Sequence, residues 1–241
     1  MSGHSKWATI KRAKGAADIR RGAAFTKLSN AITLAVKQGG GITDPDQNFK
    51  LRLAVESAKT NNMPKDTIDR AIARAAGRDA AQFQELIYEG FAPGGVAVIV
   101  ETATDNNNRT SGAIKSLFNK AGASFGQPGS VSYLFQVSGM ITVKKSGKTT
   151  DDIFMIAADQ GATDIEEIDD NTVAVYTSSE TLSKIRQKLQ ENGFEIESAE
   201  FVRKPNTQIP LDPVQTERVV DFLSSLEELD DVQKVYSNIS V

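Results

Sequence analysis

Residues 1–27 hold a run of cations that is interrupted by a single carboxylate, Asp18. Cations at this density neutralise phosphates and release counterions when they bind nucleic acid. The segment also carries the only Trp and the only His of the chain, whose rings can stack on an exposed base. A solvated terminus is the alternative for a charge run alone, but the aromatic residues favour a nucleic-acid-binding arm. Its candidate contacts are His4, Lys6, Trp7, Lys11, Arg12, Lys14, Arg20, Arg21 and Lys27.

A second basic feature lies on the third predicted helix. Arg70, Arg74 and Arg78 are four residues apart, so they share one face of that helix. The short turn before it resembles a helix-turn-helix, but a recognition helix reads bases from its N-terminal end, which here carries Asp66 and Asp69. We therefore predict that Arg70 and Arg74 contact phosphates and do not read bases. The alternative is a surface stripe paired with the two aspartates.

The polar motif of residues 105–110 (Asp-Asn-Asn-Asn-Arg-Thr) is predicted to begin another helix. Amide and guanidinium donors beside a positive helix terminus suit a phosphate or the edge of a nucleotide. Helix capping explains Asn108 and Thr110 without a ligand. Arg109 remains, and we assign it as a candidate nucleic-acid contact.

The remaining chemistry of the sequence argues against an enzyme. The chain has no Cys, which excludes disulfides, thiolate nucleophiles, zinc fingers and iron-sulfur clusters. The acidic runs 166–170 and 227–231 lack the spacing of a calcium loop, and residues 39–41 (Gly-Gly-Gly) lack the Lys-Ser/Thr of a phosphate loop. We therefore predict no catalytic residue, no metal site and no cofactor.

The net charge of -3 conceals a strong asymmetry along the chain. Residues 1–78 hold 15 Lys and Arg against 6 Asp and Glu, a net charge of +9, whereas residues 79–241 hold 13 against 25, a net charge of -12. The basic segment predicts nucleic acid, DNA or RNA, as its partner. The acidic remainder would repel phosphates, and we expect it to offer a surface for a protein partner. The oligomeric state stays open.

Apolar periodicity places the secondary structure. Three helices are predicted at 17–37, from about 47 to 60, and at 64–77, followed by a hairpin over 88–100. A helix opened by Asn108 or Thr110 and closed by Gly122 leads to a strand at 131–135. A βαββαβ pattern then takes strands 140–143, 163–168, 172–176 and 194–202 and helices 151–159 and 180–192. The last helix, at 213–229, and the strand at 232–236 return to the first sheet, because they cannot form a domain alone.

The fold class that follows is α+β. An N-terminal three-helix domain (1–79) precedes two α+β, ferredoxin-like domains, the second inserted in the first: the middle domain takes 80–136 plus 205–241, and the insertion takes 137–204. No stretch approaches the roughly 20 apolar residues of a membrane span, and the start lacks the apolar run of a secretory signal. We therefore expect a cytoplasmic protein.

Several motifs in fixed order resemble those of the YebC/PmpR family. They are Gly-His-Ser-Lys-Trp at 3–7, Gly-Gly-Gly at 39–41, Asn-Asn-Met-Pro at 61–64, Tyr-Glu-Gly at 88–90, Pro-Gly-Gly at 93–95, the 105–110 motif, and Asp-Asp-Val-Gln-Lys-Val-Tyr at 230–236. The resemblance implies three domains around a cleft and a cytoplasmic DNA-binding transcriptional regulator. Other members of that family, including a mitochondrial relative, are translation factors that act on messenger RNA or the ribosome. Both functions stand as hypotheses here, and the resemblance implies no catalytic residue.

Overall fold

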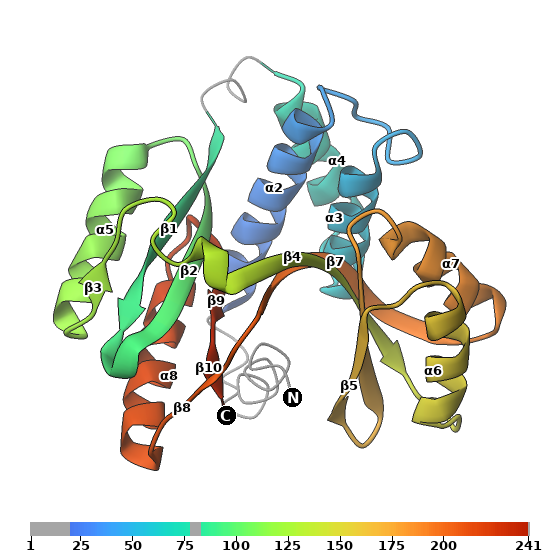
Figure 1. Cartoon of the computed structure of the whole chain (residues 1–241). Helices are drawn as coiled ribbons and strands as arrows, with labels where there is room; N and C mark the ends of the chain where they lie inside the picture. Colours follow the sequence, from blue (N-terminus) through green and yellow to red (C-terminus); the bar gives the residue numbers. More distant parts are fainter. Residues whose placement is uncertain (1–19, 78–82, 241) are drawn as a thin grey trace. The chain divides into compact units, whose positions relative to one another are not determined.

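The computed structural model describes residues 20–77 and 83–240 of the chain (Figure 1). Within this range the chain forms two compact units. The first consists of residues 134–208 together with Ser240, and the second of residues 20–77, 83–133 and 209–239. The fold class is α+β, as predicted, with helices first and antiparallel sheets after them.

The second unit begins with three helices, α2 (Arg20–Gln38), α3 (Phe49–Thr60) and α4 (Lys65–Ala75). Helix α2 packs against both α3 and α4. The three predicted helices are therefore present, and the small apolar residues on their facing stripes allow close packing. The buried core of the bundle is formed by Ile32, Ala35, Val36, Leu51, Val55, Ala58, Met63, Ile68, Ala71 and Ala75.

The end of α2 is fixed by glycines and by one buried amide. Gly40 and Gly41 have φ values of 70° and 85°, the left-handed conformation that ends a helix without a steric penalty for glycine. The side chain of Asn48 donates to the carbonyls of Ala35 and Ile42, at 3.0 Å each, and also caps α3. The prediction that residues 39–41 stop a helix is confirmed.

The middle sheet of this unit follows the bundle. Its strands are β1 (Gln84–Ala92), β2 (Val96–Thr104), β3 (Ser124–Phe125) and β9 (Val232–Ser237), in the order β3-β1-β2-β9 with antiparallel neighbours. The turn at Pro93–Gly95 (η2) joins β1 to β2 as the hairpin that the sequence predicts. The return of the last strand to this sheet is confirmed, because β9 pairs with β2. The short strands β8 (Ile209–Pro210) and β10 (Ile239–Ser240) pair with each other in a separate two-stranded sheet.

Two helices, α5 (Asn107–Lys120) and α8 (Pro213–Glu227), pack against strands of this sheet. They contact each other through Phe118 and Phe222, whose ring centroids lie 5.0 Å apart in an edge-to-face arrangement. Helix α2 of the bundle also contacts β2 and β9. The bundle and the middle sheet therefore pack together within one unit.

The strand predicted at 131–135 is wrong. Residues Ser132–Leu134 form a 3-10 turn (η3), and the third strand of the middle sheet is instead β3. The reason is the carboxylate of Glu89, which accepts the backbone N–H groups of Gly129, Val131 and Ser132 at 2.8, 2.7 and 2.9 Å. These groups are engaged by a side chain and cannot join a strand ladder.

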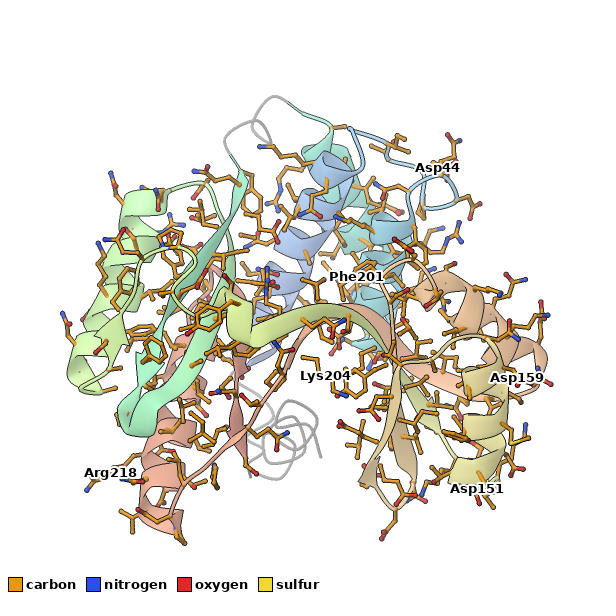
Figure 2. All side chains as sticks on the ribbon, in the orientation of Figure 1. Asp44, Asp151, Asp159, Phe201, Lys204 and Arg218 are labelled. Atoms are coloured by element: carbon orange, nitrogen blue, oxygen red, sulfur yellow. The ribbon has the colours of Figure 1, made fainter. Side chains whose placement is uncertain are left out.

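The first unit has the predicted βαββαβ order. It contains β4 (Phe135–Lys144), α6 (Thr150–Asp159), β5 (Asp164–Asp169), β6 (Thr172–Thr177), α7 (Leu182–Glu191) and β7 (Glu195–Pro205), with the antiparallel strand order β5-β6-β4-β7. Lys204 of β7, which is labelled in Figure 2, forms ion pairs with Asp164 and, at 3.2 Å, with Glu166. Its ammonium also lies 4.0 Å from the ring centroid of Tyr176.

Candidate nucleic-acid interface

Most of the predicted basic arm lies outside the described residues. His4, Lys6, Trp7, Lys11, Arg12 and Lys14 belong to this group, as does Arg78 of the predicted arginine stripe. Arg20 and Arg21 form the beginning of α2. The arm as a contact surface therefore stays a prediction from the sequence.

Lys27, about two turns into α2, forms a hydrogen bond within the protein. Its Nζ donates to the carbonyl oxygen of Glu227, at the end of α8. Farther along α2, the Nζ of Lys37 donates to the carbonyl of Phe83 at 2.6 Å, and Gln38 donates to Glu85 at 2.6 Å. Side chains of α2 thus link the bundle to the end of α8 and to the start of β1, and Lys27 is one of these links.

Arg70 and Arg74 are both exposed on α4. Arg70 donates to the carbonyl of Asp66 at 3.1 Å and to the hydroxyl of Thr67 at 3.3 Å. The surface-stripe alternative requires ion pairs with Asp66 or Asp69. Within the part of the chain that the structure describes, neither arginine forms one. No carboxylate of the described residues pairs with either guanidinium group, so both are available to bind the phosphates of a partner.

The 105–110 motif is mostly structural. Asn106 caps α5, since its side chain accepts the backbone N–H of Arg109 at 3.1 Å. The prediction that Asn108 or Thr110 is the cap is wrong, because β2 ends at Thr104 and the helix begins only two residues after Asp105. The hydroxyl of Thr110 is buried and donates to Asp231 at 2.7 Å.

Arg109 lies between two carboxylates. Its Nη2 is 2.9 Å from each oxygen of Asp231, its Nε is 3.2 Å from Asp231 Oδ2, and Nη2 is 3.0 Å from Asp105 Oδ1. The hydrogen bonds to Asp231 are the main reason that the pKa of Arg109 is raised. Asp231 is 122 residues away in the chain, between α8 and β9, and sequence reasoning missed it. The signal for it was present in the 230–236 motif.

The remaining asparagines of the motif differ in their contacts. Asn107 accepts the hydroxyl of Tyr88 at 2.8 Å, and burial, followed by the charge of Asp231, raises the pKa of Tyr88. Asn108 is exposed, and its side chain has no hydrogen-bond partner among residues 20–77 and 83–240. The 105–110 motif thus joins β1, β2, α5 and the α8–β9 loop to one another.

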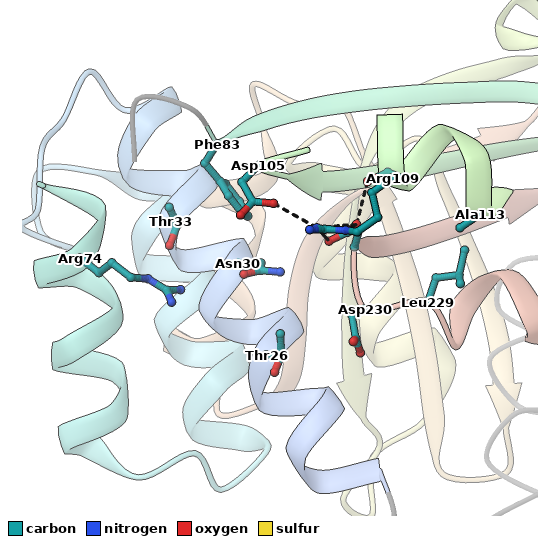
Figure 3. A pocket seen from close by; sticks show the side chains of 12 residues that line it. Thr26, Asn30, Thr33, Arg74, Phe83, Asp105, Arg109, Ala113, Leu229 and Asp230 are labelled. Carbon is teal, nitrogen blue, oxygen red and sulfur yellow. Dashed lines mark hydrogen bonds and ion pairs between the residues drawn. The ribbon is translucent and has the colours of Figure 1, made fainter. Parts of the chain in front are cut away.

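A cavity of about 630 Å³ lies between the bundle and the middle sheet, inside the second unit (Figure 3). Thr26, Asn30 and Thr33 of α2 line it on one side, at helical spacing, and Arg74 of α4 adds a cation. The other side includes Arg109 and the α8–β9 loop. Of the predicted contacts, the structure therefore brings together Arg74 and Arg109. The polar i, i+4, i+7 pattern on α2 was the signal that could have identified this face.

None of the helices in the described part of the chain is long and apolar enough to span a membrane. No group of three or more His, Asp or Glu side chains in the same range is arranged to hold a metal ion.

The fold and the site define a class of proteins with a helical bundle packed on an α+β domain, a second α+β unit inserted in that domain, and a basic N-terminal sequence. The chain belongs to the TACO1/YebC family. The model of the TACO1/YebC protein N-terminal domain matches residues 5–78, and the model of the TACO1/YebC second and third domain matches residues 83–239.

The chain is similar to relatives over more than nine-tenths of their length. "Probable transcriptional regulatory protein" of Chloroflexus aggregans is 47% identical over 244 residues, covering 100% of this chain and 96% of the relative. A protein of the same name from Roseiflexus castenholzii is 47% identical over 246 residues, with the same coverage. The crystal structure of a conserved hypothetical protein from Aquifex aeolicus is similar, with a TM-score of 0.84 and 38% identity, covering 92% of this chain and 91% of that one.

Proposed function

We propose that the protein is a cytoplasmic, non-catalytic regulator of gene expression that binds nucleic acid, with DNA as its ligand and transcription as the regulated process. The observation that carries this proposal is the separation of charge, +9 in residues 1–78 against -12 in residues 79–241. The name "Probable transcriptional regulatory protein" of the relatives from Chloroflexus aggregans and Roseiflexus castenholzii supports the choice of transcription.

The mode of binding that fits the bundle is contact with phosphates. Arg70 and Arg74 are exposed on α4 and form no ion pair in the described part of the chain, so they suit a negatively charged backbone. Asp66 and Asp69 are exposed near the start of the same helix, where a recognition helix would present donors to bases. Binding should therefore depend strongly on salt and weakly on base sequence.

The second candidate function is regulation of translation through messenger RNA or the ribosome. The feature that favours it is Trp7, which is placed among the cations of residues 1–27. A tryptophan stacks on an unpaired base, whereas uniform duplex DNA offers no exposed base face. Trp7→Ala should then weaken RNA binding far more than DNA binding. Equal losses on both ligands would contradict the translation hypothesis.

The experiment that tests the proposal compares affinities for duplex DNA, structured RNA and ribosomes at one stated salt concentration. The key variant replaces Lys11, Arg12, Arg20 and Arg21 together by Gln. The slope of log affinity against log salt should flatten by about 0.7 to 0.9 for each lost phosphate contact.

The matched control replaces four exposed lysines outside the basic segment, Lys115, Lys120, Lys184 and Lys188, by Gln. It changes the net charge by the same amount, so its slope should stay close to that of the wild type. If both variants show the same slope, long-range charge and not local contact governs binding. An unchanged slope in the first variant removes these four residues from the interface.

A further inference from the structure

Asn30 of α2 is a largely buried polar residue whose amide faces the cavity. The residue is 9% exposed, lines the cavity of about 630 Å³, and its amide has no hydrogen-bond partner among the described residues. Asn30 is not among the described residues whose fully buried side-chain atoms lack a hydrogen-bond partner, so its amide is not sealed in the core and its atoms reach the open space of the cavity. Figure 3 shows the amide pointing from α2 toward the side of the cavity where Arg109 and Asp230 lie. An amide held in this way suits a ligand that enters the cavity.

The charged groups that line the cavity restrict which net charge the ligand can carry. The lining contains two arginines, Arg74 and Arg109, and three aspartates, Asp105, Asp230 and Asp231. Arg109 is already bound by Asp105 and Asp231. Arg74 and Asp230 form no ion pair within residues 20–77 and 83–240, so one free cation and one free carboxylate remain. This balance disfavours a fully enclosed anion and suits a neutral group with donors and acceptors on its edge.

The volume of the cavity and the apolar part of its lining also favour a small ligand with polar edges. Phe83 adds an aromatic side chain, and Ala113 and Leu229 add apolar surface. A volume of about 630 Å³ lies within the range of small-molecule sites, roughly 300 to 1,000 Å³. A flat heterocycle with polar edges satisfies these demands, because its faces contact apolar side chains while its edges pair with amide and carboxylate groups.

We propose that this cavity receives one unpaired nucleobase of a single-stranded nucleic acid. Asn30 and Asp230 bind the edge of the base, and the exposed Arg74 binds the phosphate of the same nucleotide at the mouth of the cavity. The proposal rests on the proposed function and adds a requirement to it: the ligand must contain an unpaired nucleotide. Duplex without unpaired bases then binds only through phosphate contacts elsewhere.

The test uses the full chain and two pairs of variants. Asn30→Ala removes the unpartnered amide, and Asn119→Ala removes an exposed amide on α5 that does not line the cavity. Arg74→Gln removes the cavity cation, and Arg70→Gln removes its neighbour one turn earlier on the same helix. The probes are fluorescently labelled single-stranded RNA and DNA oligonucleotides, the matching duplexes, and free nucleoside monophosphates, all at one salt concentration.

Asn30→Ala should raise the Kd for single strands by about fivefold or more, with no change for duplexes. Its melting temperature should not fall, because the amide has no partner to lose and Ala favours the helix. Arg74→Gln should weaken single-strand binding more than Arg70→Gln does. Asn119→Ala should match the wild type on every probe.

The contrary results are distinct. Single-strand affinity that is unaffected by Asn30→Ala overturns the cavity proposal and leaves the proposed function standing. Equal losses for Arg70→Gln and Arg74→Gln, with Asn30→Ala silent, indicate binding on the outer face of α4. Free nucleotides that bind in an Asn30-dependent way, without any oligonucleotide binding, identify a mononucleotide site and overturn the strand proposal. A wild type that binds none of the nucleic acids overturns the proposed function itself.

Discussion

Glu89 is the residue that holds the longest irregular loop of the middle domain. It is 5% exposed, and its carboxylate accepts three backbone N–H groups from residues 129–132. Burial alone would raise the pKa of this carboxyl, but the donors of Val131, Gly129 and Ser132 outweigh it, so the pKa lies below its ordinary value of 4.5. The ionised form of Glu89 therefore stabilises the fold.

Glu89→Gln tests this role. The variant replaces one acceptor oxygen by an NH₂ group that faces backbone donors, so at neutral pH it should lower the free energy of unfolding by about 1–3 kcal/mol. A depressed folded-state pKa gives stability that is present above the unfolded pKa and is lost as the pH falls through the folded pKa. The difference between wild type and variant should thus shrink on acidification below about pH 4.5. Denaturant unfolding across this pH range measures it, and a constant difference would argue against the charge of Glu89.

Arg109 shows where residue-level prediction from the sequence stops. Its helix-start position was predictable from the 105–110 pattern, because polar residues at that spacing favour a helix start. Its partner was not, because Asp231 meets it only after the chain has passed through the inserted unit and α8. With its guanidinium bound by two carboxylates, Arg109 stays a candidate nucleic-acid contact whose substitution also disturbs the fold. The melting temperature of Arg109→Ala must therefore be measured together with its affinity, to separate a lost contact from a disturbed fold.

At the level of single elements, the start of α5 depends on one asparagine of three. The side chain of Asn106 accepts the backbone N–H of Arg109. Asn108, the second residue of α5, is exposed and does not cap the helix. Asn106→Ala should cost about 1 kcal/mol of stability, and Asn108→Ala should stay within about 0.5 kcal/mol of the wild type. Thermal unfolding of the two variants, which have the same composition, compares them directly. Equal costs would mean that the cap contributes nothing beyond helix propensity.

The same contrast explains which elements the sequence predicts. The helices of the bundle and the βαββαβ unit follow from apolar periodicity, which each segment carries by itself. Strand β3 has only two residues and exists because it pairs with Gly90 and Phe91 of β1. A Cβ at Gly90 would lie 2.3 Å from the carbonyl oxygen of Ser124, so this glycine permits the close approach. An element that forms only by pairing with a segment distant in sequence cannot be predicted from its own residues.

At the scale of the whole molecule, charge and chain connection set the inserted unit apart. Residues 134–208 hold 8 Lys and Arg against 13 Asp and Glu, a net charge of -5. The chain enters and leaves this unit through paired residues, since Phe135 of β4 lies opposite Pro205 of β7. On α6, Phe154 and Met155 are exposed at 52% and 65%. This acidic unit with exposed apolar side chains fits a protein partner better than it fits nucleic acid.

Replacing residues 135–205 by a short Gly/Ser linker separates the two roles. Because the ends of the removed segment are adjacent, the linker should not strain the middle sheet, and circular dichroism together with a cooperative melting curve checks that the remainder is folded. The shortened protein keeps every predicted basic contact and loses a net charge of -5, so its affinity for nucleic acid at a fixed salt concentration should equal or exceed that of the full chain. Its regulatory activity in the cell should fall, because the acidic surface that we propose for a protein partner is gone. A folded deletion with weakened nucleic-acid binding would place part of the interface in residues 135–205, against the charge argument.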